Sequence, residues 1–107
     1  MLTIRQAFTG LYLPNRPQLA PLTIQRYLDE IRRWEVRTPN PVLSEITTET
    51  FNRYRAACLK AGLKASSIES GIRTILQVLR LCGPEQERRQ GLGLIPRVPF
   101  EIGRAHV

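Results

Sequence analysis

The chain has 107 residues, a length that fits one domain with one modest hydrophobic core. Apolar residues make up 42% of the sequence and charged residues 23%, which is ordinary for a water-soluble protein, and no apolar run approaches the roughly 20 residues that a membrane span needs. The N-terminus has neither the basic start nor the long apolar stretch of a signal peptide, so we expect a cytoplasmic protein with no membrane partner.

Basic residues outnumber acidic ones by 16 to 9, which gives a formal net charge of +7. A basic domain of this kind favours a polyanionic partner. Lysine occurs only at positions 60 and 64, so the other 14 of the 16 basic residues are arginine, the side chain best suited to phosphate and guanine. A genome rich in G and C would also encode arginine in place of lysine, and composition alone leaves both explanations open.

Two helices are predicted in the first part of the chain, over positions 3–13 and 21–37. Pro14 stops the first helix, and Pro21 is well placed in the first turn of the second. The prolines at 39 and 41 end the second helix because each disfavours helix in the residue before it. The apolar residues that recur at helical spacing are Ile4, Ala7, Phe8 and Leu11 in the first helix and Ile24, Leu28 and Ile31 in the second.

Two further helices are predicted over positions 48–61 and 66–82. Thr47 can cap the third helix, and Gly62 is a natural C-terminal stop for it. The S-x-x-E spacing that starts at Ser66 is that of a capping box at the beginning of the fourth helix. The apolar stripes are Phe51, Tyr54 and Cys58 in the third helix and Ile68, Ile72, Ile75, Leu76 and Leu79 in the fourth.

The predicted fold class is therefore all-α, with four helices packed into one domain over residues 1–83. Residues 84–107 are rich in glycine and proline and show no helical repeat, so we interpret them as an irregular linker or tail. The expected core is Phe8, Leu11, Ile24, Leu28, Ile31, Phe51, Tyr54, Cys58, Ile68, Ile72, Ile75 and Leu79.

The pattern of reactive residues favours neither an enzyme nor a metalloprotein. The single histidine, His106, stands alone, and neither a phosphate-binding loop nor a dinucleotide-binding motif is present. Cys58 and Cys82 fall on apolar stripes, so we expect buried free thiols rather than a disulfide or a metal site. The three tyrosines lie in predicted helices and are expected to be core or rim aromatics rather than nucleophiles. We therefore expect no catalytic residue, no cofactor and no bound metal.

The polar faces of the second and fourth helices form the candidate binding surface. The first turn of the fourth helix is rich in hydroxyls, and a helix N-terminus with free N–H groups and hydroxyls suits a phosphate. Acids are absent from that helix after Glu69. A solvated charged face would look much the same, and this alternative stays open. The candidate residues are Thr23, Arg26 and Arg33 on the second helix, Lys64 in the turn before the fourth, and Ser66, Ser67, Ser70, Arg73 and Gln77 on the fourth.

Two stretches, TIQRYLDEIRRW and LSEITTETFNRYRAACLKAGLKASSIESGIRTILQVLRLC, together resemble the core-binding domain of tyrosine recombinases of the phage-integrase type. The resemblance covers about residues 2–83 and lies in the order and spacing of its motifs. The matching positions are Thr23, the connector Leu43-Ser44-Glu45-Ile46-Thr47, Glu49 with Phe51, the turn Ala61-Gly62-Leu63, and Ser67-Ile68 with Arg73. The stretch GLGLIPRVP also looks like the linker that leads from this module to a catalytic domain.

The resemblance implies an orthogonal four-helix bundle of the SAM-like type that forms half of a clamp around duplex DNA. The second and fourth helices of such a module approach the major groove next to the strand-exchange site. The catalytic arginine, lysine, histidine and tyrosine residues of the family lie downstream of the linker, so this chain would bind DNA as a monomer without cleaving it, beside its own catalytic domain. The sequence departs from the family at Pro21-Leu22-Thr23, where Ser-Pro-Ser-Thr is common.

A helical protein–protein interaction domain is the alternative function, because an apolar groove between helices could hold a partner helix. The two functions differ in one measurable property. Binding to DNA weakens steeply as salt rises, since bound phosphates release counterions, whereas binding through an apolar groove does not.

Overall fold

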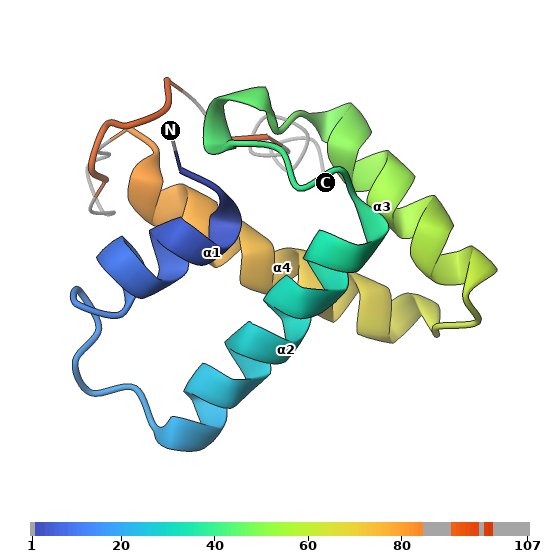
Figure 1. Cartoon of the computed structure of the whole chain (residues 1–107), viewed down its shortest axis with the longest axis horizontal. Helices are drawn as coiled ribbons and strands as arrows, with labels where there is room; N and C mark the ends of the chain where they lie inside the picture. Colours follow the sequence, from blue (N-terminus) through green and yellow to red (C-terminus); the bar gives the residue numbers. More distant parts are fainter. Residues whose placement is uncertain (1, 85–90, 97, 100–107) are drawn as a thin grey trace.

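The computed structural model describes residues 2–84, 91–96, 98 and 99, and in these residues the chain is all-helical and has no strand. A π-helical turn, Phe8–Tyr12, continues the first helix, and a short 3₁₀ helix, Leu43–Glu45, precedes the third. The four α-helices are α1 (Ile4–Ala7), α2 (Pro21–Arg37), α3 (Thr48–Lys60) and α4 (Ala65–Cys82), as Figure 1 shows. The predicted all-α fold with four helices is confirmed.

The first predicted helix is wound in two different ways. α1 begins at a capping box, in which the Gln6 N–H donates to Thr3 Oγ1 at 3.4 Å and the Thr3 N–H donates to the Gln6 side-chain oxygen at 3.0 Å. Beyond α1, the Leu13 N–H donates to the Phe8 carbonyl five residues back, at 2.9 Å, as in a π-helix. The apolar spacing in this segment predicts a helix but not this change in winding.

α2 begins and ends where its prolines predict. Pro21 occupies the first turn, where its missing N–H has no partner to lose. At the other end, Thr38 Oγ1 donates to the Trp34 carbonyl at 2.7 Å and accepts from the Asn40 N–H at 3.0 Å. Asn40 has a φ of 54°, in the left-handed region that asparagine tolerates better than most residues. This turn directs the chain away from α2 and toward α3.

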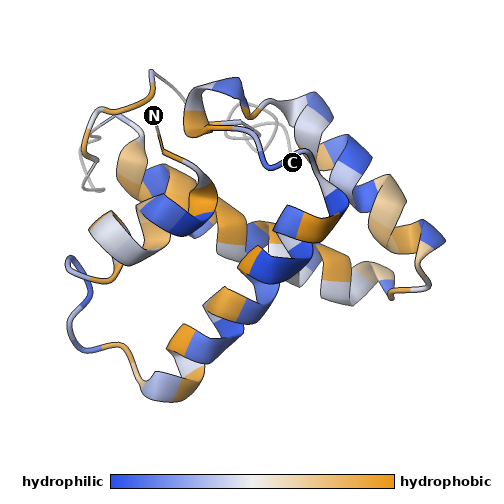
Figure 2. Cartoon of the chain, in the orientation of Figure 1, coloured by the Kyte–Doolittle hydropathy of each residue, from blue (hydrophilic) through white to orange (hydrophobic). Residues whose placement is uncertain are grey.

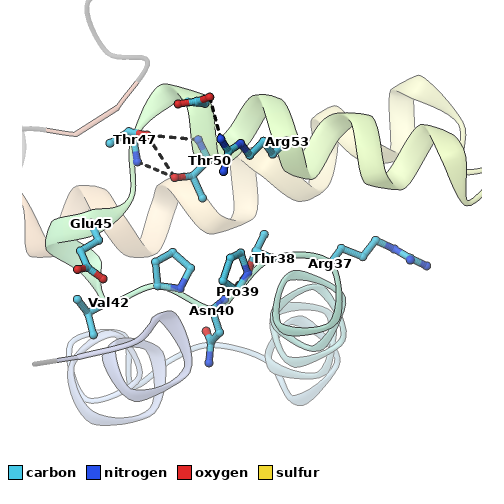
Figure 3. A pocket seen from close by; sticks show the side chains of 11 residues that line it. Arg37, Thr38, Pro39, Asn40, Val42, Glu45, Thr47, Thr50 and Arg53 are labelled. Carbon is cyan, nitrogen blue, oxygen red and sulfur yellow. Dashed lines mark hydrogen bonds and ion pairs between the residues drawn. The ribbon is translucent and has the colours of Figure 1, made fainter.

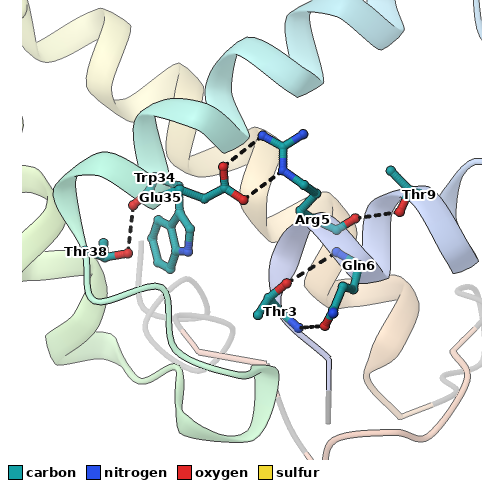
Figure 4. A network of polar contacts seen from close by, with 7 residues as sticks. All are labelled: Thr3, Arg5, Gln6, Thr9, Trp34, Glu35 and Thr38. Atoms are coloured by element: carbon teal, nitrogen blue, oxygen red, sulfur yellow. Dashed lines mark hydrogen bonds and ion pairs between the residues drawn. The ribbon is translucent and has the colours of Figure 1, made fainter.

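A two-pronged ion pair ties α1 to α2 (Figure 4). Arg5 Nε and Nη2 each donate to one carboxylate oxygen of Glu35, at 2.8 Å in both cases. The planar guanidinium matches the carboxylate in this arrangement. Hydrogen bonding from Arg5 holds the pKa of the Glu35 carboxyl below its usual range.

α3 has the predicted signals at both ends. Thr47 caps its start, with Oγ1 accepting from the Thr50 N–H at 3.3 Å. At its end, Gly62 has a φ of +90°, which only glycine adopts without strain. The Gly62 N–H donates to the Leu59 carbonyl at 3.0 Å and the Leu63 N–H to the Cys58 carbonyl at 3.1 Å. These two bonds form a Schellman motif, which closes the helix and turns the chain into α4.

The predicted capping box at the start of α4 is wrong. The helix begins at Ala65, Lys64 is its N-cap, and no side chain caps it. Ser66 therefore lies inside the first turn and not at the N-cap position that a capping box requires. Glu69 binds α3 instead, because Arg55 Nε and Nη2 donate to its two oxygens at 2.5 and 3.0 Å.

The core lies where α4 meets the other helices, and Figure 2 shows apolar residues along most of α4 but alternating with polar ones on α2. Trp34 is fully buried at its centre, with ring centroids 5.3 Å from Phe51 and 5.2 Å from Tyr54. Ile72 is 3% exposed, as the prediction requires. Three predicted core residues are only partly buried and pack at the edge: Leu11, Ile24 and Leu28. The last two lie in the first half of α2, which extends beyond the bundle (Figure 1).

Part of the predicted tail packs against the end of α4. The Leu92 N–H donates to the Leu81 carbonyl at 2.7 Å, and the Leu94 N–H to the Cys82 carbonyl at 2.8 Å. Ile95 and Val98 are buried and belong to the core. The described part of the segment is irregular, as expected, but it adds two core residues that the sequence pattern does not reveal. Residues 85–90, 97 and 100–107 of the predicted linker lie outside the described residues.

The predicted free cysteines are confirmed, since Cys58 and Cys82 are buried and unpaired. Burial raises the pKa of the Cys82 thiol. No described helix is at once long enough and apolar enough to cross a bilayer.

Candidate nucleic-acid interface

The two helices of the predicted binding surface cross each other (Figure 1). Gly71 of α4 lies against Glu30 of α2 at this crossing. A Cβ added at position 71 would lie 2.3 Å from the carboxylate carbon of Glu30, well inside van der Waals contact. The absence of a side chain at this position therefore allows the Glu30 carboxylate to lie directly on the α4 backbone. The crossing sets how the outer faces of α2 and α4 lie with respect to each other.

The Glu30 carboxylate is buried at this crossing, with 8% of the residue exposed. Oε2 accepts a short hydrogen bond from the Tyr54 hydroxyl of α3, and Oε1 accepts from Arg33 Nη1 at 3.1 Å. Burial, together with the hydrogen bond to Glu30, raises the pKa of Tyr54 well above its usual range. The hydroxyl therefore stays protonated and remains a donor. One carboxylate thus joins α2, α3 and α4.

The three predicted residues on α2 differ in their exposure and in their contacts with other side chains. Thr23 is partly exposed, and Arg26 is exposed and forms no ion pair among the described residues. Arg33 is partly exposed, with 35% of its side chain accessible, and is paired with Glu30. The structure brings Arg33 to the crossing, next to α4. Arg26 and Thr23 lie four and seven residues before Glu30, about 6 and 10 Å back along the helix axis.

The predicted residues on and before α4 all lie on its exposed face. They stand opposite the buried stripe that contains Ile68, Ile72 and Ile75. Because no side chain caps α4, the backbone N–H groups of its first turn are available to an anion. Lys64, predicted in the preceding turn, is the N-cap residue. The exposed residues are Lys64, Ser66, Ser67, Ser70, Arg73 and Gln77.

Charge is distributed unevenly over this face of α4. Arg73 is exposed, and in the described part of the chain it forms no ion pair. Glu69, one turn earlier, is engaged by Arg55; this hydrogen bond first, and the nearby charge of Arg73 to a smaller extent, hold the pKa of the Glu69 carboxyl below its usual range. The nearest acid on α4 is therefore already neutralised from α3. The arrangement can bind a phosphate chain through cations and hydroxyls.

Glu30 and Gly71 are residues of this surface that the sequence analysis missed. A glycine in the middle of a long apolar helix costs about 1 kcal/mol relative to alanine, so such a glycine calls for a packing reason. Gly71 interrupts the apolar stripe between Ile68 and Ile72, so the sequence does indicate close packing at this position. Its partner gives no such indication, since Glu30 is a charged residue that adjoins the polar face of its amphipathic helix.

A second surface feature is a cleft of about 510 Å³ between the end of α2, the following loop and the start of α3 (Figure 3). Its walls carry both acids and bases, and Arg53 is paired with Glu49 at 3.1 Å. Thr47 and Thr50 are occupied with capping α3. This mixture of charges makes the cleft a poorer site for a polyanion than the surface of α2 and α4.

Comparisons with known proteins find nothing similar: no protein-family model, no curated protein and no solved structure matches the chain. Among the described residues, no cluster of histidine, cysteine and acidic side chains could hold a metal ion.

Proposed function

We propose that this chain is a DNA-binding module of the kind found on the N-terminal side of tyrosine recombinases, where it holds duplex DNA near the site of strand exchange. The observation that carries the proposal is the exposed row of hydroxyl, amide and cationic side chains on α4, beside the cations of α2, in a chain of net charge +7. Three cations of this surface have no ion-pair partner in the described residues: Arg26, Lys64 and Arg73. Such groups bind a phosphate chain at little cost in broken contacts.

The side chains have different roles in this proposal. The hydroxyls of Ser66, Ser67 and Ser70, together with Lys64, contact phosphates and fix the register of the module on the duplex. Arg73 and Gln77 are long enough to reach base edges in the major groove. We further propose that the module works in the cytoplasm, binds as a monomer beside a catalytic domain of its own protein, and catalyses no step itself.

Titration of the chain with a fluorescent duplex of mixed sequence tests the proposal. Half a clamp should bind weakly, with a dissociation constant of about 10⁻⁴–10⁻⁶ M at physiological salt. Three phosphate contacts would lower the affinity roughly 40-fold between 50 and 200 mM salt. Chemical-shift mapping at low salt should show changes on α2 and the exposed face of α4. Affinity that does not depend on salt, or shifts confined to α1 and α3, would contradict the proposal.

A protein-interaction domain is the second candidate, and one observation favours it. A small apolar groove of about 250 Å³ lies between the N-terminal segment, the 3₁₀ helix and the packed tail. Leu94 lines it and is half exposed. Leu94→Arg would abolish binding of a partner in this groove but leave the affinity for DNA unchanged or slightly higher, so the same variant separates the two functions.

A further inference from the structure

Arg33 differs from the other cations of the proposed DNA surface in having a partner inside the protein. Its Nη1 lies 3.1 Å from Oε1 of Glu30, whereas Arg26, Lys64 and Arg73 form no ion pair in the part of the chain that the structure describes. Part of the Arg33 charge is therefore compensated before DNA arrives.

The Glu30 carboxylate has little freedom to release Arg33. It rests on the α4 backbone at Gly71, and the Tyr54 hydroxyl holds its other oxygen. Glu30 is only 8% exposed. If Arg33 moved to a phosphate, the Glu30 carboxylate would keep only the Tyr54 hydroxyl as a hydrogen-bond donor. Leaving a buried charge without its counter-charge is strongly unfavourable. The pair should therefore persist when DNA binds.

We propose that Glu30 is a positioning residue of the surface formed by α2 and α4, which holds the Arg33 guanidinium at the helix crossing and keeps its charge from acting as a free phosphate contact. This inference rests on the DNA binding proposed above. Arg33 then presents its remaining N–H groups from a fixed place, which suits directional hydrogen bonds to DNA. Arg26 and Lys64, which form no ion pair among the described residues, supply the sequence-independent attraction to phosphates.

The variant Glu30→Gln tests this role. Glutamine keeps the volume above Gly71 and an oxygen that can accept from Tyr54, but it no longer holds Arg33 by charge. Binding to a mixed-sequence duplex should become tighter at 50 mM salt, and the log–log salt slope should steepen by about 0.9, one further released counterion. The added slope corresponds to a roughly threefold larger loss of affinity between 50 and 200 mM salt.

Glu49→Gln is the matched control, because it makes the same change in net charge and releases Arg53 on an exposed part of α3. It should change affinity and slope less than Glu30→Gln does. A double-mutant cycle with Arg33→Gln completes the test, since the gain from Glu30→Gln should disappear when Arg33 is absent. Equal effects of the two glutamate variants, or a gain that survives without Arg33, would overturn the inference and leave DNA binding itself standing.

The remaining outcomes are also decisive. If the wild-type chain shows no salt-dependent binding, the proposed function and this inference fall together. If Glu30→Gln does not fold, two other variants decide: Lys64→Gln should lower the salt slope by about one, and Arg33→Gln, whose amide can still donate to Glu30, by clearly less. Equal losses would show that Arg33 is a free phosphate contact and that Glu30 does not restrain it.

Discussion

The hydroxyl of Tyr54 supports a buried charge, since it donates to the Glu30 carboxylate. Tyr54→Phe keeps the ring against Trp34 but removes this donor, and we expect a loss of roughly 1–3 kcal/mol in the free energy of unfolding. Urea unfolding at neutral pH measures the loss. Tyr27→Phe is the control, because that hydroxyl meets only the neutral hydroxyl of Tyr12, at 2.9 Å, and should cost about 0.5–1.5 kcal/mol. A larger loss for Tyr27→Phe would contradict the assigned role of Tyr54.

Arg73 is the exposed arginine at the centre of the α4 face. Arg73→Gln removes the guanidinium that the proposal places at base edges, so affinity for a selected site should fall by roughly 1–3 kcal/mol. Binding to a mixed-sequence duplex should weaken less, because only one cation near the phosphates is lost. Arg53→Gln makes the same charge change on α3, and fluorescence anisotropy at two salt concentrations compares the variants. Equal effects would mean that net charge matters and position does not.

The crossing of α2 and α4 depends on the absence of a side chain at Gly71. In Gly71→Ala, either the Glu30 carboxylate swings away from Tyr54 and Arg33 or the two helices separate. Both routes lose packing or hydrogen bonds, and we expect a net loss of about 1–3 kcal/mol despite the better helix propensity of alanine. Gly10→Ala is the control, since nothing lies within 4 Å of its added Cβ and its φ is not left-handed. Thermal unfolding should show no loss of stability for Gly10→Ala.

Two ion pairs between helices should make the fold sensitive to acid: Arg5–Glu35 joins α1 to α2, and Arg55–Glu69 joins α3 to α4. Each carboxyl has a folded-state pKa below the ordinary value of 4.5, so its stabilising contribution is complete above that pH and is lost as pH falls through the folded pKa. The midpoint of thermal unfolding should therefore fall as pH is lowered below about 4.5. The double variant Glu35→Gln, Glu69→Gln should show a smaller fall of the unfolding midpoint in acid. The same fall in the double variant as in the wild type would contradict the role of these two ion pairs.

The helices were predictable because the information that defines them is local. Apolar spacing, Pro21, Thr47 and Gly62 each act within one or two turns, and the structure has helices where they indicate. The error at Ser66 has a physical reason: the S-x-x-E spacing is local, but Glu69 is engaged by Arg55, 14 residues away. A competing partner of that kind cannot be recognised without knowing how α3 and α4 pack.

The exposed faces of the candidate surface were also predictable, since residues opposite an apolar stripe lie on the outside. The contact of Glu30 with Tyr54 and Gly71, which joins the two helices, was not predictable from the sequence. Glu30 meets Tyr54 across 24 residues of chain and Gly71 across a still longer stretch, and contacts so distant in sequence leave no periodic pattern. The same holds for Ile95, because an irregular segment gives no pattern from which its burial could be inferred.

The chain beyond α4 contributes to the core through Ile95, which is 4% exposed. Ile95→Ala removes buried methyl groups and should cost about 2–5 kcal/mol of unfolding free energy. Leu94→Ala is the matched control, because its side chain is 52% exposed and should cost much less. Urea unfolding of both variants measures the difference. Similar small losses would mean that the segment does not belong to the folded domain.

The burial of Trp34 gives the protein an optical reporter of its own. The sequence contains one tryptophan, and it is fully buried between α2 and α3. Its fluorescence should shift to longer wavelength when unfolding brings the indole into water, whereas a ligand on the outer face of α4 would leave the indole in the same surroundings. A variant that stops binding DNA without this shift has lost a contact and kept its fold, so one fluorescence measurement distinguishes loss of binding from loss of structure.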